Sequence, residues 1–157
     1  MKYLLGLTLI IGISLAAIAG IKSNSSDQSQ EDIFTAIRSI DYISINILLA
    51  DGVDIDTVDQ QGNTPLMVAA NVGNPRIMDI VLSHNPQINK KNNDGTTALM
   101  IAAKTGQLHA VKDLTAHDAD LSLRDNNRNT ALTLASKYGH TEIVHFLQDL
   151  QPQPRVM

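Results

Sequence analysis

The chain has 157 residues, of which 43% are hydrophobic, so it is long enough to form one domain with a core. Its formal net charge is −4 and no run rich in Lys or Arg occurs, which argues against nucleic acid or an anionic membrane surface as the main partner. The absence of cysteine excludes disulfides, thiolate zinc sites and a cysteine nucleophile.

The first predicted element is an export signal. Lys2 is followed by an apolar run over residues 3–18, and small residues stand at Ala17 and Ala19. A positive start, an apolar core and an A-x-A site are typical of a secretory signal peptide, so we expect residues 1–19 to be removed. The alternative is an uncleaved anchor, because about 18 apolar residues can span a bilayer. A short signal of this kind indicates bacterial Sec export and a periplasmic protein.

Two polar segments flank the predicted folded domain. Residues 20–30, which include SNSSDQSQ, contain few apolar side chains and are expected to form a flexible linker. The last residues, QPQPRVM over 151–157, are marked by prolines and are expected to form a short tail. The folded domain is therefore predicted over residues 31–150.

Within this domain the sequence repeats itself every 33 residues. The period relates GNTPLMVAANVG (62–73) to GTTALMIAAKTG (95–106) and RNTALTLASKYG (128–139). It also relates ILLADGVDID (47–56) to IVLSHNPQIN (80–89) and DLTAHDADLS (113–122). A 33-residue period with T-P-L, a pair of small residues and a closing glycine closely resembles the ankyrin repeat. The resemblance implies an all-α repeat solenoid of about four units, each a helix–turn–helix with a hairpin loop, over residues 31–58, 59–91, 92–124 and 125–150.

Each part of the repeated string has a physical reason. A threonine before each first helix can accept hydrogen bonds from the unpaired amides there, and Pro65 suits the first helical position. A glycine after the helix adopts a left-handed conformation without strain. Pairs of small residues are expected where neighbouring helices stack closely. These positions are Thr64, Thr97 and Thr130; Gly73, Gly106 and Gly139; and Ala69-Ala70, Ala102-Ala103 and Ala135-Ser136.

The chain departs from the family pattern at several positions. The histidine that follows T-P-L in the family is replaced by Met67, Met100 and Thr133, so the Thr–His hydrogen bond is expected to be lost. Arg128 replaces a tip glycine, and Ile40 stands where the first unit needs a glycine. Terminal repeats are expected to be atypical, because one face of each lacks a stacking neighbour.

No residue pattern indicates chemistry. His84 and His117 are one period apart, and we interpret them as surface residues and not as zinc ligands, which must converge on one ion. The acidic segment DGVDIDTVD (51–59) lacks the glycine and the final glutamate of a calcium-binding hand loop. We therefore predict no catalytic residue, no metal site and no cofactor, and hence a protein that is not an enzyme.

The family resemblance implies a binding surface instead. In ankyrin-repeat proteins the inner helices and the hairpin tips form a concave face that binds other proteins. Carried over to this sequence, the inner-helix positions are Arg38, Asn71, Val72, Lys104, Thr105, Lys137 and Tyr138. The tip positions are Gln60, Gln61, Asn93, Asp94, Asn126, Asn127 and Arg128. Tyr138 is the best single anchor, because rigid aromatic side chains are favoured at binding hot spots.

These observations predict a protein–protein interaction module of the cell envelope, monomeric when free. We expect it to bind an exported enzyme, such as a cell-wall hydrolase, and to inhibit or guard it as an immunity-type partner. Two alternatives remain open. One is a periplasmic support protein for oxidative-stress defence, of the kind associated with catalases. The other is an exported effector that binds a host protein.

Overall fold

The computed structural model describes residues 25–151, which form paired helices. The predicted signal peptide lies outside the described residues, as do residues 152–157 of the predicted tail. No strand occurs in the described part of the chain, and the all-α repeat solenoid is confirmed. The helices are α2 (Ser25–Arg38), α3 (Tyr42–Ala50), α4 (Pro65–Val72), α5 (Pro75–Leu82), α6 (Ala98–Thr105), α7 (Leu108–Ala116), α8 (Ala131–Lys137) and α9 (Thr141–Asp149).

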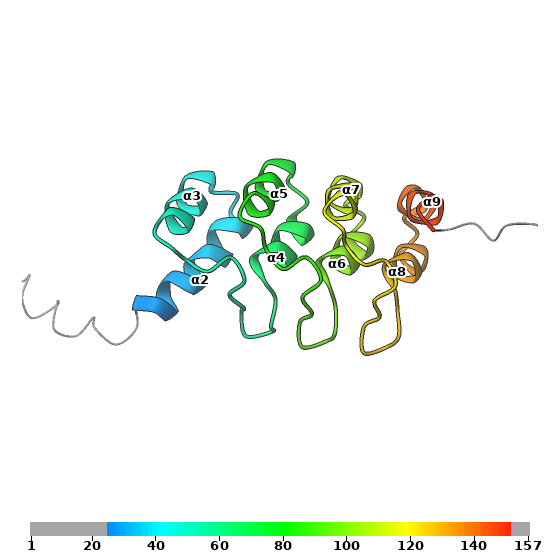
Figure 1. Ribbon diagram of the computed structural model, residues 1–157, viewed down its shortest axis with the longest axis horizontal. Helices are drawn as coiled ribbons and strands as arrows, with labels where there is room; N and C mark the ends of the chain where they lie inside the picture. The colour runs from blue at the N-terminus through cyan, green and yellow to red at the C-terminus, as the bar shows by residue number, and fades with distance from the viewer. Residues whose placement is uncertain (1–24, 152–157) are drawn as a thin grey trace, which may run out of the picture.

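The helices lie in two rows. Figure 1 shows α2, α4, α6 and α8 in an inner row and α3, α5, α7 and α9 in an outer row, with the long loops projecting beyond the inner row. Each inner helix packs against the outer helix that follows it and against the inner helices of the neighbouring repeats. None of the helices between residues 25 and 151 is long and apolar enough to cross a bilayer.

Threonine caps begin three of the inner helices, as the sequence predicts. The hydroxyls of Thr64, Thr97 and Thr130 each accept a hydrogen bond from the backbone amide three residues later, at 3.2, 3.3 and 3.3 Å. Such a cap stabilises a helix by about 1 kcal/mol. Pro65 occupies the first turn of α4 without the loss of a hydrogen bond, because amides there have no partner within the helix.

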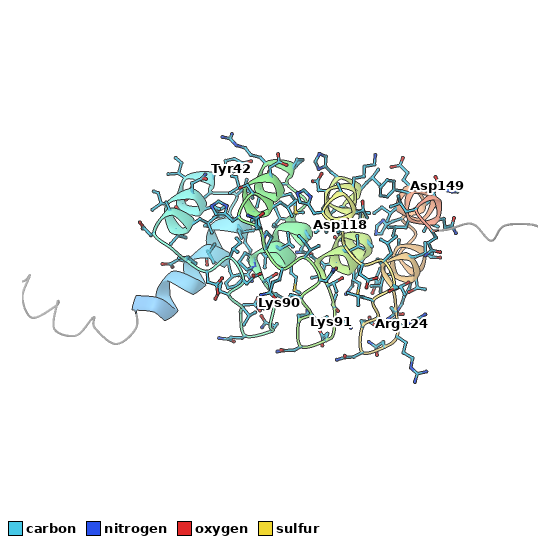
Figure 2. All side chains as sticks on the ribbon, viewed as in Figure 1. Tyr42, Lys90, Lys91, Asp118, Arg124 and Asp149 are labelled. Carbon is cyan, nitrogen blue, oxygen red and sulfur yellow. The ribbon has the colours of Figure 1, made fainter. Side chains whose placement is uncertain are left out.

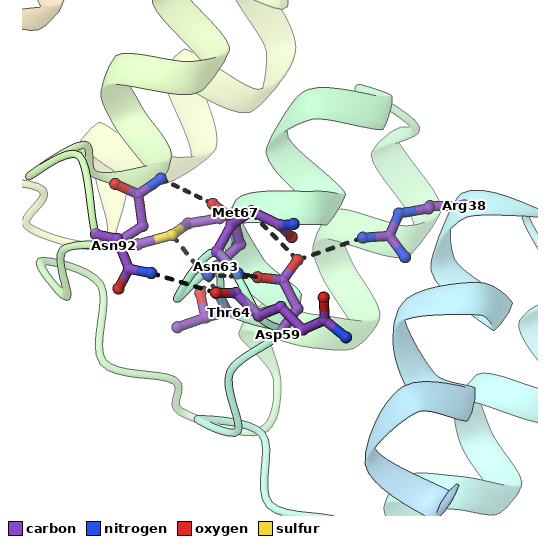
Figure 3. Close-up of polar contacts among 9 residues, drawn as sticks. Arg38, Asp59, Asn63, Thr64, Met67 and Asn92 are labelled. Carbon is purple, nitrogen blue, oxygen red and sulfur yellow. Dashed lines mark hydrogen bonds and ion pairs between the residues drawn. The ribbon is translucent and has the colours of Figure 1, made fainter.

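The missing family histidine is replaced by other acceptors. The Met67 sulfur lies 3.5 Å from the Thr64 amide nitrogen, and the Thr133 hydroxyl oxygen accepts from the Thr130 amide at 2.7 Å. Figure 3 shows the Met67 contact at the base of the loop. The predicted loss of the Thr–His bond therefore leaves the reciprocal cap intact at these two helices.

Left-handed backbone occurs at the positions where the period places it, whichever residue is present. Gly73 and Gly106 have φ of 69° and 80°, and Ile40 takes the same role in the first repeat with φ of 59°. Arg128 stands in for the tip glycine with φ of 65°. An L-residue in this region costs about 1–2 kcal/mol, and a β-branched side chain such as Ile40 is rarely found there. Repeat packing thus determines the backbone path at Ile40.

The core runs along the contact between the two rows. The alanine pairs Ala69-Ala70 and Ala102-Ala103 are fully buried, which confirms their predicted role in close helix stacking. Ser136, the equivalent of the second alanine in the last repeat, is exposed, so its predicted burial is wrong. The physical reason is that α8 is the last inner helix among the described residues, and no further inner helix covers this side of it.

The predicted flexible linker is wrong over residues 25–30. These residues belong to α2, which begins at Ser25. The segment contains neither Gly nor Pro. Once Ile33, Phe34 and Ile37 anchor the helix in the core, each further residue adds one hydrogen bond without a new nucleation cost. The low hydrophobicity of residues 25–30 indicates only that they form no core of their own. A helix that starts from buried residues can still extend into such a segment.

Lysine side chains connect the loops of successive repeats. Lys90 Nζ donates a 2.7 Å hydrogen bond to the backbone oxygen of Asp56, and Lys91 Nζ donates one of 2.9 Å to that of Arg124 (Figure 2). The outer row has its own connection, where Asn74 donates a 3.0 Å hydrogen bond to the Tyr42 hydroxyl. Successive repeats are therefore held together by polar contacts as well as by the core.

Candidate functional site

A groove of about 520 Å³ lies between the inner helices and the projecting loops. Side chains of α4, α6 and α8 contribute to one wall and loop residues to the other. The lining residues are Arg38, Asn63, Met67, Val68, Asn71, Asn92, Asp94, Thr96, Ile101, Lys104, Thr105, Asp125, Asn127, Asn129, Leu134, Lys137 and Tyr138. The inner helices and the hairpin tips thus enclose a hollow surface, as the family resemblance implies.

The structure brings only part of the predicted binding set into this groove. The predicted residues that line it are Arg38, Asn71, Asp94, Lys104, Thr105, Asn127, Lys137 and Tyr138. The predicted residues that do not are Gln60, Gln61, Val72, Asn93, Asn126 and Arg128. The part that each plays in partner binding stays a prediction.

Asn93 and Asn126 lie outside the groove because they join the loops to one another. The Asn93 amide and side chain donate to the backbone oxygens of Gln61 and Gln60, at 3.1 and 3.3 Å. One repeat later, Asn126 donates in the same way to Asp94 and Asn93, at 3.0 and 3.1 Å. These asparagines therefore hold the rim of the groove in place.

Three residues that the sequence analysis did not select for binding organise the loops from their base. The side-chain oxygen Oδ1 of Asn92 accepts from the amides of Asp94 and Thr96, at 3.0 and 2.9 Å. Asp59 and Asp125 make the equivalent pairs of hydrogen bonds in the loops before and after. Figure 3 shows the Asp59 loop and its link to Asn92. The signal was in the sequence, because these acceptors recur every 33 residues.

The floor of the groove was also missed. Val68, Ile101 and Leu134 lie one helical turn before the predicted contact residues Asn71, Lys104 and Lys137, and they share the same face. Val68 and Leu134 are buried and Ile101 is partly buried. The three-residue spacing to residues already selected would have identified them, so the groove has an apolar floor beneath polar walls.

Charges in the groove are partly paired. Arg38 Nη2 lies 3.4 Å from Asp59 Oδ2, and the Asp59 side chain is only 7% exposed (Figure 3). In the last loop, burial raises the pKa of Asp125, but hydrogen bonds from Asn129 and Asn127 and the charge of Lys137 lower it below its ordinary value. Asp125 is therefore held in its ionised form at neutral pH.

Tyr138 stands at the end of α8 with two lysines around its ring. Its side chain is 47% exposed. The Nζ atoms of Lys104 and Lys137 lie 5.6 and 5.8 Å from the ring centroid, within the range of cation–π attraction. Lys104 comes from the preceding repeat, so this cluster exists only because α6 and α8 pack side by side.

The histidines singled out in the sequence lie away from the groove. The Nδ1 atoms of His84 and His117 are 2.9 and 2.8 Å from the backbone oxygens four residues earlier, Ile80 and Asp113, at the ends of outer helices. Among the described residues, no group of three or more His, Cys, Asp or Glu side chains is arranged to hold a metal ion. The groove is thus lined by amides, hydroxyls, cations, two carboxylates and apolar side chains.

The fold and the groove together define a class, a helical repeat solenoid that presents a hollow face. Residues 33–125 and 85–156 match a family model described as ankyrin repeats (3 copies). The chain belongs to the ankyrin-repeat family, and it is a protein–protein interaction module. No curated protein shows a significant match to this sequence.

Proposed function

We propose that this protein is exported to the cell envelope and binds an exported enzyme, such as a cell-wall hydrolase, to inhibit or guard it. The groove is the binding surface, and the enzyme inserts a loop or active-site rim between the inner helices and the hairpin tips. The protein acts as a stoichiometric partner and performs no reaction of its own.

The observation that carries this proposal is the groove itself. Its apolar floor is bordered by amides, by cations and by the carboxylates of Asp94 and Asp125, and Tyr138 supplies an exposed aromatic side chain of the type that dominates binding energy. The loops that form its rim are hydrogen-bonded to one another before any partner arrives. A surface that is already ordered loses less conformational entropy on binding, which favours tight association.

Affinity capture from an envelope extract, with mass spectrometry of the bound proteins, tests this proposal. We expect one exported enzyme to bind in a one-to-one complex and to lose activity in it. The double substitution Tyr138→Ala, Lys104→Glu should abolish capture with little change in thermal unfolding, because both side chains are exposed. Lys112→Glu on α7, outside the groove, is the matched control and should retain capture.

Two results would contradict the proposal. Full capture by the double variant would place the interface outside the groove. A purified protein that transforms a substrate unaided would contradict the non-enzymatic role. Export is tested separately by cell fractionation, in which the chain should reach the periplasm and deletion of residues 1–19 should retain it in the cytoplasm.

A further inference from the structure

The lysines around Tyr138 form the most distinctive charge arrangement in the groove. Lys104 and Lys137 are one repeat apart, and both ammonium groups lie within 6 Å of the same ring. Two like charges beside one ring repel each other, and a negative charge placed between them lowers the energy of both. The ring itself supplies a modest part of that attraction through its negative face.

The carboxylates of this region do not form a contact ion pair with either lysine. Among the described residues, the ion pairs closer than 4 Å involve Arg38 with Asp59 and His109 with Asp113. Asp125 feels the charge of Lys137, but both of its oxygens are already occupied by hydrogen bonds from its own loop. Asp94 also lines the groove, on the loop wall.

The groove is therefore divided by charge across its width. Arg38, Lys104 and Lys137 project from the ends of the inner helices, and Asp94 and Asp125 belong to the loops. An acidic group that enters beside the loops meets like charge, whereas one that enters beside Tyr138 meets two ammonium groups. Like-charge contacts at an interface suppress wrong orientations, so this division selects where an acid can sit.

We propose that the partner enzyme places the carboxylate of an Asp or Glu side chain between Lys104 and Lys137, beside the hydroxyl group of Tyr138. The inference rests on the proposed function, because it names the chemistry of the group that the groove receives. The carboxylate accepts hydrogen bonds from both ammonium groups, and such charge-assisted bonds are stronger than neutral ones. The tyrosine hydroxyl offers a further donor. The partner's contact surface is thus acidic at the C-terminal end of the groove.

A titration with small peptides tests this carboxylate-binding site without knowledge of the partner. The Tyr138 ring signals of the purified protein are followed by NMR as blocked Gly-Glu-Gly peptide is added, to about 10 mM, the range of a weak single-group interaction. Blocked Gly-Gln-Gly peptide is the neutral control, and sodium chloride at matched ionic strength is the control for a nonspecific anion. We expect saturable shifts with the glutamate peptide only.

Substitutions assign the response to the lysines. Lys104→Gln with Lys137→Gln should weaken glutamate-peptide binding by about threefold to tenfold, in line with partly exposed ion pairs. Lys112→Gln is the matched control, because Lys112 Nζ also lies over an aromatic ring, 5.8 Å from the Phe146 centroid, but outside the groove. This variant should bind like the unchanged protein.

Each result decides the inference. No shift with the glutamate peptide, equal shifts with the glutamine peptide, or equal shifts with sodium chloride would overturn it, as would unchanged binding in the double glutamine variant. Its failure is distinguishable from that of the proposed function. If the double glutamine variant captures the exported enzyme as well as the unchanged protein does, the carboxylate site at Lys104 and Lys137 is refuted and the proposed function stands. If neither protein captures an enzyme, the proposed function is refuted. The peptide titration still shows whether Lys104 and Lys137 bind a carboxylate.

Discussion

Asn92 donates a 2.8 Å hydrogen bond from Nδ2 to Oδ1 of Asn63, a residue of the preceding hairpin loop (Figure 3). The other side-chain atom, Oδ1 of Asn92, closes its own loop by accepting two backbone hydrogen bonds. One side chain thus shapes one loop and connects it to the next, at the wall of the groove. The stability of the array and the shape of its binding face therefore depend on the same contacts.

We expect Asn92→Ala to destabilise the protein by about 1–3 kcal/mol, because two loop amides lose their acceptor and Asn63 loses its donor. The free energy of unfolding, measured by urea denaturation, provides the test. Asn127→Ala is the control, since the hydrogen bond found at Asn127 is made by its backbone amide. Equal stability of the two variants would contradict this account of the loops.

Gly106 and Gly139 have the same φ of 80°, so substitutions at the two positions distinguish the cost of backbone strain from the cost of steric crowding. A methyl group on Gly106 would lie 2.6 Å from the His140 ring, whereas one on Gly139 would meet nothing within 4 Å. Gly139→Ala should cost only the left-handed strain of about 1–2 kcal/mol. Gly106→Ala should cost more, because His140 must also give up its 3.0 Å hydrogen bond to the Lys104 backbone oxygen. Thermal unfolding of both variants is the measurement, and equal losses would contradict the crowding argument.

Ile40 offers a stabilising substitution. Its φ of 59° strains a β-branched residue, and its side chain is 42% exposed and lies outside the hydrophobic core, so Ile40→Gly removes the strain without opening a cavity in that core. Relief of about 1–2 kcal/mol outweighs the added flexibility of glycine in the unfolded chain, which is about 0.5–1 kcal/mol. The melting temperature should rise.

The matched control for this change is Ile47→Gly. Ile47 is more exposed than Ile40, at 54%, but it lies in the middle of helix α3. Glycine within a helix costs about 1 kcal/mol, so this variant should melt at a lower temperature than the unchanged protein. Destabilisation of the same size at Ile40 would show that the left-handed strain is relieved by other contacts.

The titration of Asp125 is expected to contribute to the pH dependence of the free energy of unfolding. Its pKa in the folded chain lies below the ordinary value of 3.8, although burial opposes this, because of the hydrogen bonds from Asn129 and Asn127 and the charge of Lys137. A lowered pKa means that the stabilisation is present above pH 3.8 and is lost as the pH falls through the folded value.

Asp125→Asn keeps an acceptor for the loop amides and removes the titration. As the pH falls below about 4, we expect the melting temperature of this variant to decrease less steeply than that of the unchanged protein. The flattening is partial, because Asp41 and Asp120 also have lowered pKa values, chiefly through hydrogen bonds from Ser44 and Ser122. Parallel curves for the two proteins would show that Asp125 contributes nothing to acid unfolding.

Local patterns in the sequence were enough for the repeat itself. The threonine caps, the small residues at Ala69 and Ala102, and the left-handed positions at Ile40 and Arg128 could all be predicted from a 33-residue period. Each of these features depends on residues a few positions apart, or on a position that recurs in every unit. Through its resemblance to the ankyrin repeat, the period therefore predicted the solenoid before any contact between units was known.

Only the tertiary structure decided what depends on stacking. Ser136 is exposed because no further inner helix packs beyond α8 in the described part of the chain, and residues 25–30 are helical because the core below them nucleates α2. Asn93 was expected at the binding face but is used to join two loops, whereas Asn92, one residue earlier, lines the groove. A linear repeat does not specify which of two adjacent loop residues turns inward. That choice is made by hydrogen bonds between units 33 residues apart, which exist only when the units are packed together.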